Sequence, residues 1–182
     1  LFKSDEVKLD IFKKNIKSGG VVKGIVVKNI SNKPRSFFDN LNKWAIDSGA
    51  KGLAYIAFEK DETKIIGKGP IAKFFSQNAL DSFVKDANVS PNDCIFFISD
   101  KHSEAIKFAG LVRTKIGTDL KLIDEDQFNF CWIVDFPMYQ YDEVEKKLEF
   151  SHNPFSMPQA NIDEFDKMDP LKILAYQYDL VC

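Results

Sequence analysis

The chain has 182 residues, enough for one domain or for one domain with part of a second. Hydrophobic residues make up 45% of it, including 17 phenylalanines, so it can bury a core and does not have the composition of a disordered protein. The formal net charge is only −2, which argues against a dedicated nucleic-acid-binding module, because such modules are usually basic overall.

Positive charge comes almost entirely from lysine, since Arg35 and Arg113 are the only arginines. Arginine is the side chain that grips phosphate in a bidentate way, so this chain is poorly equipped to hold a triphosphate alone. No apolar run approaches the length of a membrane span, and we expect no membrane partner. The chain starts with leucine and stops at Cys182 within a strand pattern, which suggests a piece of a longer protein.

The three cysteines, Cys94, Cys131 and Cys182, lie far apart and form no C-x-x-C pair. The sequence therefore predicts neither a metal site nor a disulfide framework. Cys94 and Cys131 fall in apolar, strand-like runs, and we expect both to be small core residues. Reduced thiols of this kind fit the cytoplasm.

The first part of the chain mixes strand and helix patterns. A β-branched run at 19–29 predicts a strand. Residues 32–49 predict a helix that is capped by Ser36 and ended by Gly49. Residues 50–69 predict a hairpin with strands at 53–58 and 63–66.

Two helical pieces follow, the second at about 79–86, and then a short, nearly continuous apolar strand at 94–100. Residues 99–120 predict another helix, with Gly117 as its stop. This order favours an α+β fold, in which an antiparallel sheet carries helices packed on one face, over repeated parallel units.

The composition changes after residue 118. A polar, acidic stretch is followed by a buried-looking strand at 129–135 and a hairpin with arms at 138–142 and 147–152. These elements have no partners of their own with which to form a core. We therefore expect three parts: a compact domain, a linker, and an incomplete second domain, at 1–118, 119–128 and 129–182.

Two polar residues of the last part are candidates for a site. Asp135 ends the strand just before Phe136 and Pro137, where a turn cap is favoured over a pocket carboxylate. His152 precedes the irregular stretch NPFSMP, with no nucleophile pattern and no second metal ligand nearby. From residue chemistry alone, His152 is interpreted as a polar loop residue and not as a catalytic one. The glycines at 18–20 and 67–70 also lack the spacing of a phosphate-binding loop.

Three segments in order, WIVDFPMYQYD, LEFSHNPFSMPQ and AYQYDLV, resemble the late catalytic-domain segment of bacterial-type aspartyl-tRNA synthetases. Upstream, SGAKGLAYIAFE, GPIAKFF and AIKFAGLVRTKIGTDL resemble the insertion domain of that family, the GAD domain, which tRNA-dependent amidotransferase subunits share. The resemblance covers essentially the whole chain. It identifies 1–118 as GAD-like and 129–182 as part of a class II catalytic domain.

The resemblance implies an aspartate–tRNA ligase that uses ATP and Mg²⁺ to form aspartyl-adenylate and then charges the 3′ end of tRNA. The first histidine of the family's H-H-P-F block, which contacts the substrate aspartate, corresponds to His152. Asn153 replaces the second histidine and receives no role. Asp135 is expected to shape the pocket. The implied partners are tRNA(Asp), with tRNA(Asn) left open, and a second subunit in a cytoplasmic homodimer, without DNA or membrane.

The chain lacks the motif-two arginine and the motif-three arginine and carboxylates with which the resembling family stabilises the reacting phosphorus centre. We therefore expect no catalytic residue, metal site or bound cofactor within these 182 residues, and no aminoacylation by the chain alone. Two alternatives stay open: a non-catalytic module that contacts tRNA or protein, and part of a tRNA-dependent amidotransferase. The DFPM-to-HNPF segment favours the synthetase.

Overall fold

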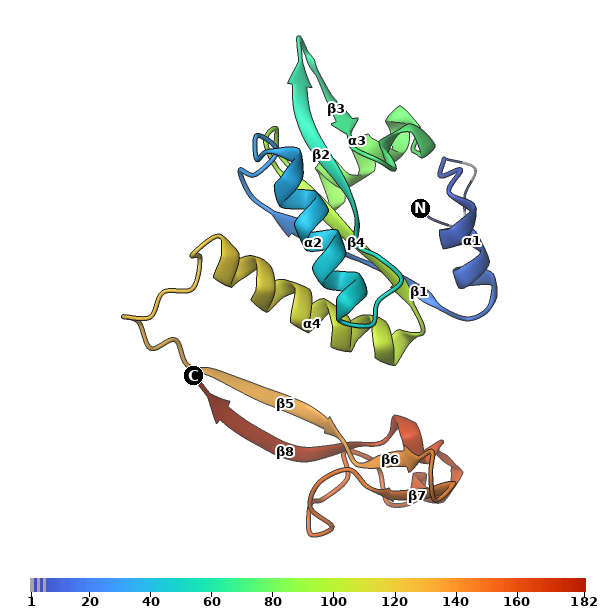
Figure 1. Cartoon of the computed structure of the whole chain (residues 1–182). Coiled ribbons are helices and arrows are strands. Elements are labelled where there is room, and N and C mark those ends of the chain that lie inside the picture. Colours follow the sequence, from blue (N-terminus) through green and yellow to red (C-terminus); the bar gives the residue numbers. More distant parts are fainter. Residues whose placement is uncertain (1, 3, 5) are drawn as a thin grey trace. The chain divides into compact units, whose positions relative to one another are not determined.

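The structure is a computed structural model that describes residues 2, 4 and 6–182 (Figure 1). It divides into two units, Leu1–Ile123 and Asp124–Cys182, and each is described by itself. No helix in this described part combines the length and the apolar character that a bilayer span requires.

A four-stranded antiparallel sheet forms the centre of the first unit, in the order β1-β4-β2-β3. Its strands are β1 (Val21–Val27), β2 (Ala54–Asp61), β3 (Lys64–Lys68) and β4 (Cys94–Asp100). Its helices are α1 (Asp10–Lys17), α2 (Arg35–Asp47), the short η1 (Ala72–Phe74), α3 (Gln77–Asp86) and α4 (His102–Asp119). The predicted α+β class is confirmed.

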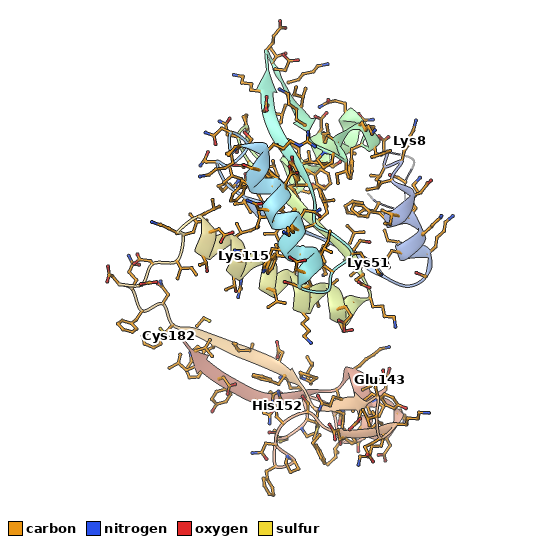
Figure 2. All side chains as sticks on the ribbon, in the orientation of Figure 1. Lys8, Lys51, Lys115, Glu143, His152 and Cys182 are labelled. Atoms are coloured by element: carbon orange, nitrogen blue, oxygen red, sulfur yellow. The ribbon has the colours of Figure 1, made fainter. Side chains whose placement is uncertain are left out.

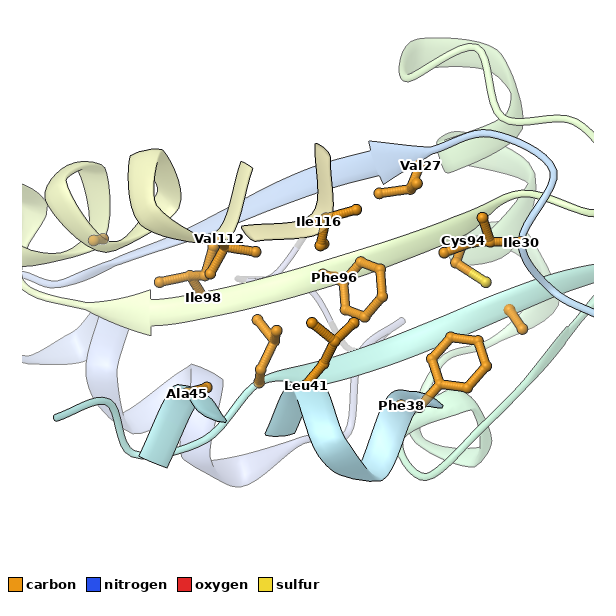
Figure 3. Close-up of a cluster of buried hydrophobic side chains, with 13 residues drawn as sticks. Val27, Ile30, Phe38, Leu41, Ala45, Cys94, Phe96, Ile98, Val112 and Ile116 are labelled. Carbon is orange, nitrogen blue, oxygen red and sulfur yellow. The ribbon is translucent and has the colours of Figure 1, made fainter. Parts of the chain in front are cut away.

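Helices cover both faces of this sheet, whereas the sequence predicted cover on one face. Helices α2 and α4 pack on the face that carries Phe96 and Ile98, and Figure 3 shows Phe38 and Leu41 of α2 in this cluster. Helices α1 and α3 pack on the opposite face, against Ile95 and Phe97. The reason lies in β4, where five consecutive residues are buried. Since neighbouring strand residues point to opposite faces, a continuous apolar run needs cover on both.

Helix α2 begins at Arg35, so the predicted cap at Ser36 is wrong. Pro34 takes the N-cap position with an extended backbone, and Lys33 before it is sterically kept out of helical geometry. Helix α4 likewise continues past Gly117 to Asp119, because its last turn packs through the buried Ile116. The local steric effect of Pro34 thus sets the start of α2, whereas packing of Ile116 extends the end of α4.

Among the residues that the structure describes, Asp93 is the one buried charged side chain, with 1% of it exposed. Its carboxylate accepts hydrogen bonds from Lys28 Nζ at 2.8 Å, the Ser90 backbone N–H at 2.8 Å and the Asn29 backbone N–H at 3.1 Å. Burial acts to raise the pKa of Asp93, but these donors outweigh it and hold the pKa below its ordinary value. The carboxylate thus fastens the end of β1 to the loop before β4.

Cys94 follows Asp93 and is fully buried, and burial raises the pKa of its thiol to about 12. Cys131 and Cys182 are exposed, so the expectation of a buried Cys131 is wrong. Because the thiolate is the reactive form, we expect an aromatic disulfide reagent at mildly alkaline pH to label Cys131 and Cys182 promptly and Cys94 only after denaturation. The Cys94→Ser variant should lose only the thiol that reacts after denaturation and keep the two that react promptly. Three prompt thiols in the native wild type would contradict this burial.

The second unit contains two separate strand pairs. Strands β5 (Cys131–Pro137) and β8 (Leu174–Val181) form one antiparallel ribbon, and the hairpin arms β6 (Tyr139–Asp142) and β7 (Lys147–Phe150) form the other. The predicted hairpin is confirmed to within two residues. Short 3₁₀ turns, η2 (Phe165–Lys167) and η3 (Pro170–Lys172), precede β8. The buried core is small and consists of Met138, Ile173 and Ala175.

The β5–β8 ribbon exposes large apolar side chains on both faces. The consecutive residues Trp132, Ile133 and Val134 are 61%, 45% and 55% exposed, and their side chains alternate between the two faces. The predicted strand at 129–135 is present, shifted by two residues, but its predicted burial is wrong. Strand β8 is the one strand beside it, and nothing in the described part of the second unit covers its large side chains. A two-stranded ribbon in water is at best marginally stable alone.

Candidate functional site

The β5–β8 ladder has a bulge at Asp135, which faces two residues of β8, Tyr176 and Gln177. The pairing register with β8 shifts between Val134 and Phe136, and Asp135 has a positive φ of 60°. A non-glycine residue in this left-handed region is uncommon and carries a cost on the order of 1 kcal/mol. Bulges redirect side chains and recur beside binding sites. Asp135 therefore lies at a bulge inside the strand and not at a turn after it, because Phe136 and Pro137 still pair with β8.

Gln159 holds a loop onto this bulge. Its side-chain Nε2 donates to Asp135 Oδ1 at 3.0 Å and to the Ala175 carbonyl oxygen at 3.0 Å. Its backbone N–H donates to the Leu174 carbonyl oxygen at 2.7 Å, and Pro158 forms a β-bridge with Ala175. The loop at 151–159 is thus fastened to both strands of the ribbon. Sequence reasoning missed Gln159, because a loop glutamine has no spacing signature of its own.

His152 lies at the start of the same loop, just after β7, and its side chain is exposed (Figure 2). Its ring meets Phe136 edge-to-face, with 4.8 Å between ring centroids and an interplanar angle of 89°. The preceding residue, Ser151, donates its backbone N–H to the Met138 carbonyl oxygen at 3.0 Å. The structure therefore brings His152 and Asp135 to one bulge, where Phe136, the neighbour of Asp135, supports the imidazole ring.

Asn153 shapes the loop directly after His152. Its Oδ1 accepts the Phe155 backbone N–H at 2.8 Å, which forms an Asx turn. Phe155 itself is 92% exposed and Met157 is 65% exposed, so the tip of the loop is apolar and uncovered. Asparagine is well suited to this turn, and a structural role accounts for the residue.

A hollow of about 670 Å³ adjoins the fastened end of the loop, between residues 157–162, Phe165 and Tyr176. No charged side chain lines it among the residues described. Across the same described residues, no three His, Cys, Asp or Glu side chains gather closely enough to hold a metal ion. His152 does not line this hollow, but its exposed imidazole can offer a hydrogen bond to a small polar ligand at the start of the loop.

Replacing Gln159 with leucine should loosen the loop. Two side-chain hydrogen bonds of roughly 1 kcal/mol each are lost, so we expect the Tyr176 amide, which donates to the Met157 carbonyl oxygen at 2.8 Å, to exchange with solvent at least about tenfold faster. Hydrogen exchange followed by NMR measures this directly. Gln140→Leu is the matched control, because Gln140 bonds Glu149 within the exposed hairpin. Equal exchange in wild type and Gln159→Leu would show that Gln159 does not anchor the loop.

The first unit is similar to a known domain family. The GAD domain matches residues 12–109, more than half of the chain, and the chain belongs to the GAD domain family. This match falls within the first unit and covers strands β1 to β4 with helices α2 and α3.

Individual relatives extend the similarity through the second unit. The chain is 52% identical over 182 residues to the aspartate–tRNA(Asp/Asn) ligase of Pelagibacter ubique, which covers 100% of the chain and 30% of that protein. Ligases of the same name from Wolbachia pipientis subsp. Culex pipiens and from Ehrlichia canis are 51% and 49% identical, over 100% and 95% of the chain. The chain spans about three tenths of the length of these curated relatives. The resemblance seen in the sequence is confirmed.

Proposed function

We propose that this chain works as part of an aspartate–tRNA ligase. The observation that carries the proposal is the 52% identity to a ligase of that name over all 182 residues, because it includes the second unit, which the GAD domain match does not reach. In this proposal, 1–118 is the GAD insertion domain, 119–128 is a linker, and 129–182 is a piece of the class II catalytic domain.

In the proposed reaction, aspartate displaces pyrophosphate from ATP to form aspartyl-adenylate, and the aspartyl group then passes to the 3′ end of tRNA. This chain contributes binding: His152 donates a hydrogen bond to the polar head of aspartate and helps to orient it for attack. Asp135 and Gln159 hold the loop in place on the bulge. The name shared by the relatives supports tRNA(Asp) and tRNA(Asn) as substrates, and we further propose a cytoplasmic homodimer.

ATP and Mg²⁺ do not fit the residues described. No carboxylate cluster among them could hold the metal, and both arginines, Arg35 and Arg113, lie in the first unit with exposed side chains. We therefore assign no phosphate chemistry to this chain. In the proposed ligase, residues outside these 182 supply it.

The bare β5–β8 ribbon supports the catalytic-domain assignment. Its large side chains stay exposed on both faces, Tyr178 among them at 68%, and monomeric soluble proteins rarely leave so continuous an apolar surface uncovered. In the proposed ligase, further strands and helices of the catalytic domain cover both faces. The His152 loop then lies inside a larger pocket.

A chimera tests the proposal. The 182 residues replace the aligned segment of the Pelagibacter ubique ligase, which is feasible at 52% identity. We expect the chimera to catalyse aspartate-dependent exchange of pyrophosphate into ATP, whereas the purified 182-residue chain alone shows no exchange. A chimera that folds but is inactive would contradict the proposal, as would exchange by the chain alone.

A further inference from the structure

A groove of about 890 Å³ runs along one edge of the sheet in the first unit. Strand β1 is the last strand in the order and pairs with β4 on one side only. The groove is lined by the second half of β1, the loop that follows it, and the C-terminal end of α4 with residues 120–123. The GAD domain match and the proposed ligase function leave this groove without a role.

Residues from both faces of β1 line the groove. Ile25 and Val27 belong to the cluster under α2 and α4, whereas Val26 between them belongs to the cluster on the opposite face. A groove lined in this way wraps around the edge of the strand rather than lying on one face. An edge strand offers unpaired backbone N–H and C=O groups to an added strand.

The apolar side chains of the lining are all aliphatic. Ile30 and Ile116 are buried at its base, while Leu122 and Ile123 remain 65% and 54% exposed at its rim. No aromatic ring lies in the lining, so the groove offers no stacking platform for the bases of single-stranded nucleic acid. Its shape and chemistry suit the aliphatic side chains of a polypeptide.

The charged groups of the lining are all cations: Lys28, Lys33 and Arg113. Lys28 is paired with Asp93, but Lys33 and Arg113 are exposed and take part in no ion pair within the described part of the chain. No carboxylate lines the groove, although the whole chain carries a net charge of −2. Two unpaired cations beside an aliphatic floor complement a partner that is both apolar and acidic.

We propose that this groove binds an extended segment of another protein in which aliphatic and acidic residues alternate. The segment adds to β1 as a further strand, so that successive side chains point in opposite directions. Its aliphatic side chains fill the groove, and its carboxylates reach Lys33 and Arg113. The inference goes beyond the proposed ligase function and does not depend on it.

The probe is a short capped peptide of alternating valine and glutamate, titrated into the isotope-labelled 182-residue chain and followed by NMR. We expect saturable shifts at Val26 and Arg113 that weaken as salt is raised. The double change Lys33→Glu with Arg113→Glu should weaken binding about tenfold or more, because two charge-assisted contacts become repulsive. Lys43→Glu with Lys64→Glu changes the net charge equally at exposed sites away from the groove and should leave the affinity unchanged.

Any of the following results would overturn the proposal. One is equal binding of the matching valine–lysine peptide, and another is shifts confined to residues away from β1 and α4. A third is tighter binding of a single-stranded RNA oligonucleotide with the same shifts. A fourth is self-association through β1 as the chain is concentrated, which would make a second copy the occupant. The last is peptide binding by the chain but not by the ligase chimera, which would mean that the ligase's own residues fill the groove.

Discussion

Replacing Asp93 with alanine is expected to lower the free energy of unfolding of the first unit by about 3 kcal/mol. The carboxylate is the shared acceptor for Lys28 and for the backbone N–H groups of Asn29 and Ser90. Without it, two partly buried N–H donors lose their partner, and each such donor costs about 1–3 kcal/mol. Lys28 adds less, because it is 52% exposed and returns to water.

Urea unfolding measures this change. Trp44 lies in the first unit and Trp132 in the second, so a Trp132→Phe background makes the fluorescence report the first unit alone. The matched control is Asp119→Ala, which removes the surface carboxylate paired with Lys115 and should cost less than about 1 kcal/mol. Equal effects of Asp93→Ala and Asp119→Ala would contradict the role assigned to Asp93.

The same carboxylate predicts a dependence of stability on pH. The pKa of Asp93 is lower in the folded chain than in the unfolded chain, so its contribution is fully present above the ordinary carboxyl pKa of about 4. The contribution is lost as the pH falls through the lower folded value. The stability difference between wild type and Asp93→Asn should therefore shrink between about pH 5 and acid below pH 4. A constant difference over this range would contradict the assignment.

Replacing His152 with alanine in the ligase chimera should lower kcat/KM for aspartate by about 10- to 100-fold. Loss of a hydrogen bond to a charged partner costs about 1.5–3 kcal/mol, and each 1.4 kcal/mol is a factor of ten. The imidazole is exposed and its ring is supported by Phe136, so it can donate without first being ordered by the ligand. The KM for ATP should change little, because His152 is proposed to contact aspartate and not ATP.

The Phe136→Leu variant distinguishes the support of the His152 ring by Phe136 from the direct contact of His152 with aspartate. This variant keeps the imidazole but removes the aromatic ring 4.8 Å from it, and we expect an intermediate loss in kcat/KM for aspartate. Asn153→Ala removes the Asx turn next to His152 and keeps both rings. An effect of Asn153→Ala as large as that of His152→Ala would point to loop shape rather than to the imidazole.

Local sequence signals predicted much of the fold. The hairpin β2–β3, the apolar strand β4 and the hairpin β6–β7 follow from strand-forming runs separated by polar turns. The run Cys94–Ile98 also carried a signal for helices on both faces, since all five residues are apolar. In this run, apolar and polar residues do not alternate, which indicates a strand covered on both faces. The prediction of helices on one face rested on the order of elements and did not use this pattern.

Burial and long-range contacts could not be predicted in the same way. Cys94 and Cys131 lie in similar apolar runs, yet one is fully buried and the other is exposed, because burial depends on what packs over the strand. The contacts of Gln159 with Asp135 and Ala175 join residues 24 and 16 positions apart. Only the folded loop shows that Asp135 sits in a bulge with a positive φ.

Aspartate saturation curves for pyrophosphate exchange by the ligase chimera test the central claim most directly. They compare the chimera with wild-type sequence in the inserted segment and the same chimera with His152→Ala. The proposed site predicts a KM for aspartate that rises about 10-fold or more in the variant, with the KM for ATP unchanged. An unchanged KM and kcat for aspartate in a folded His152→Ala chimera would contradict the claim that this loop binds the amino acid.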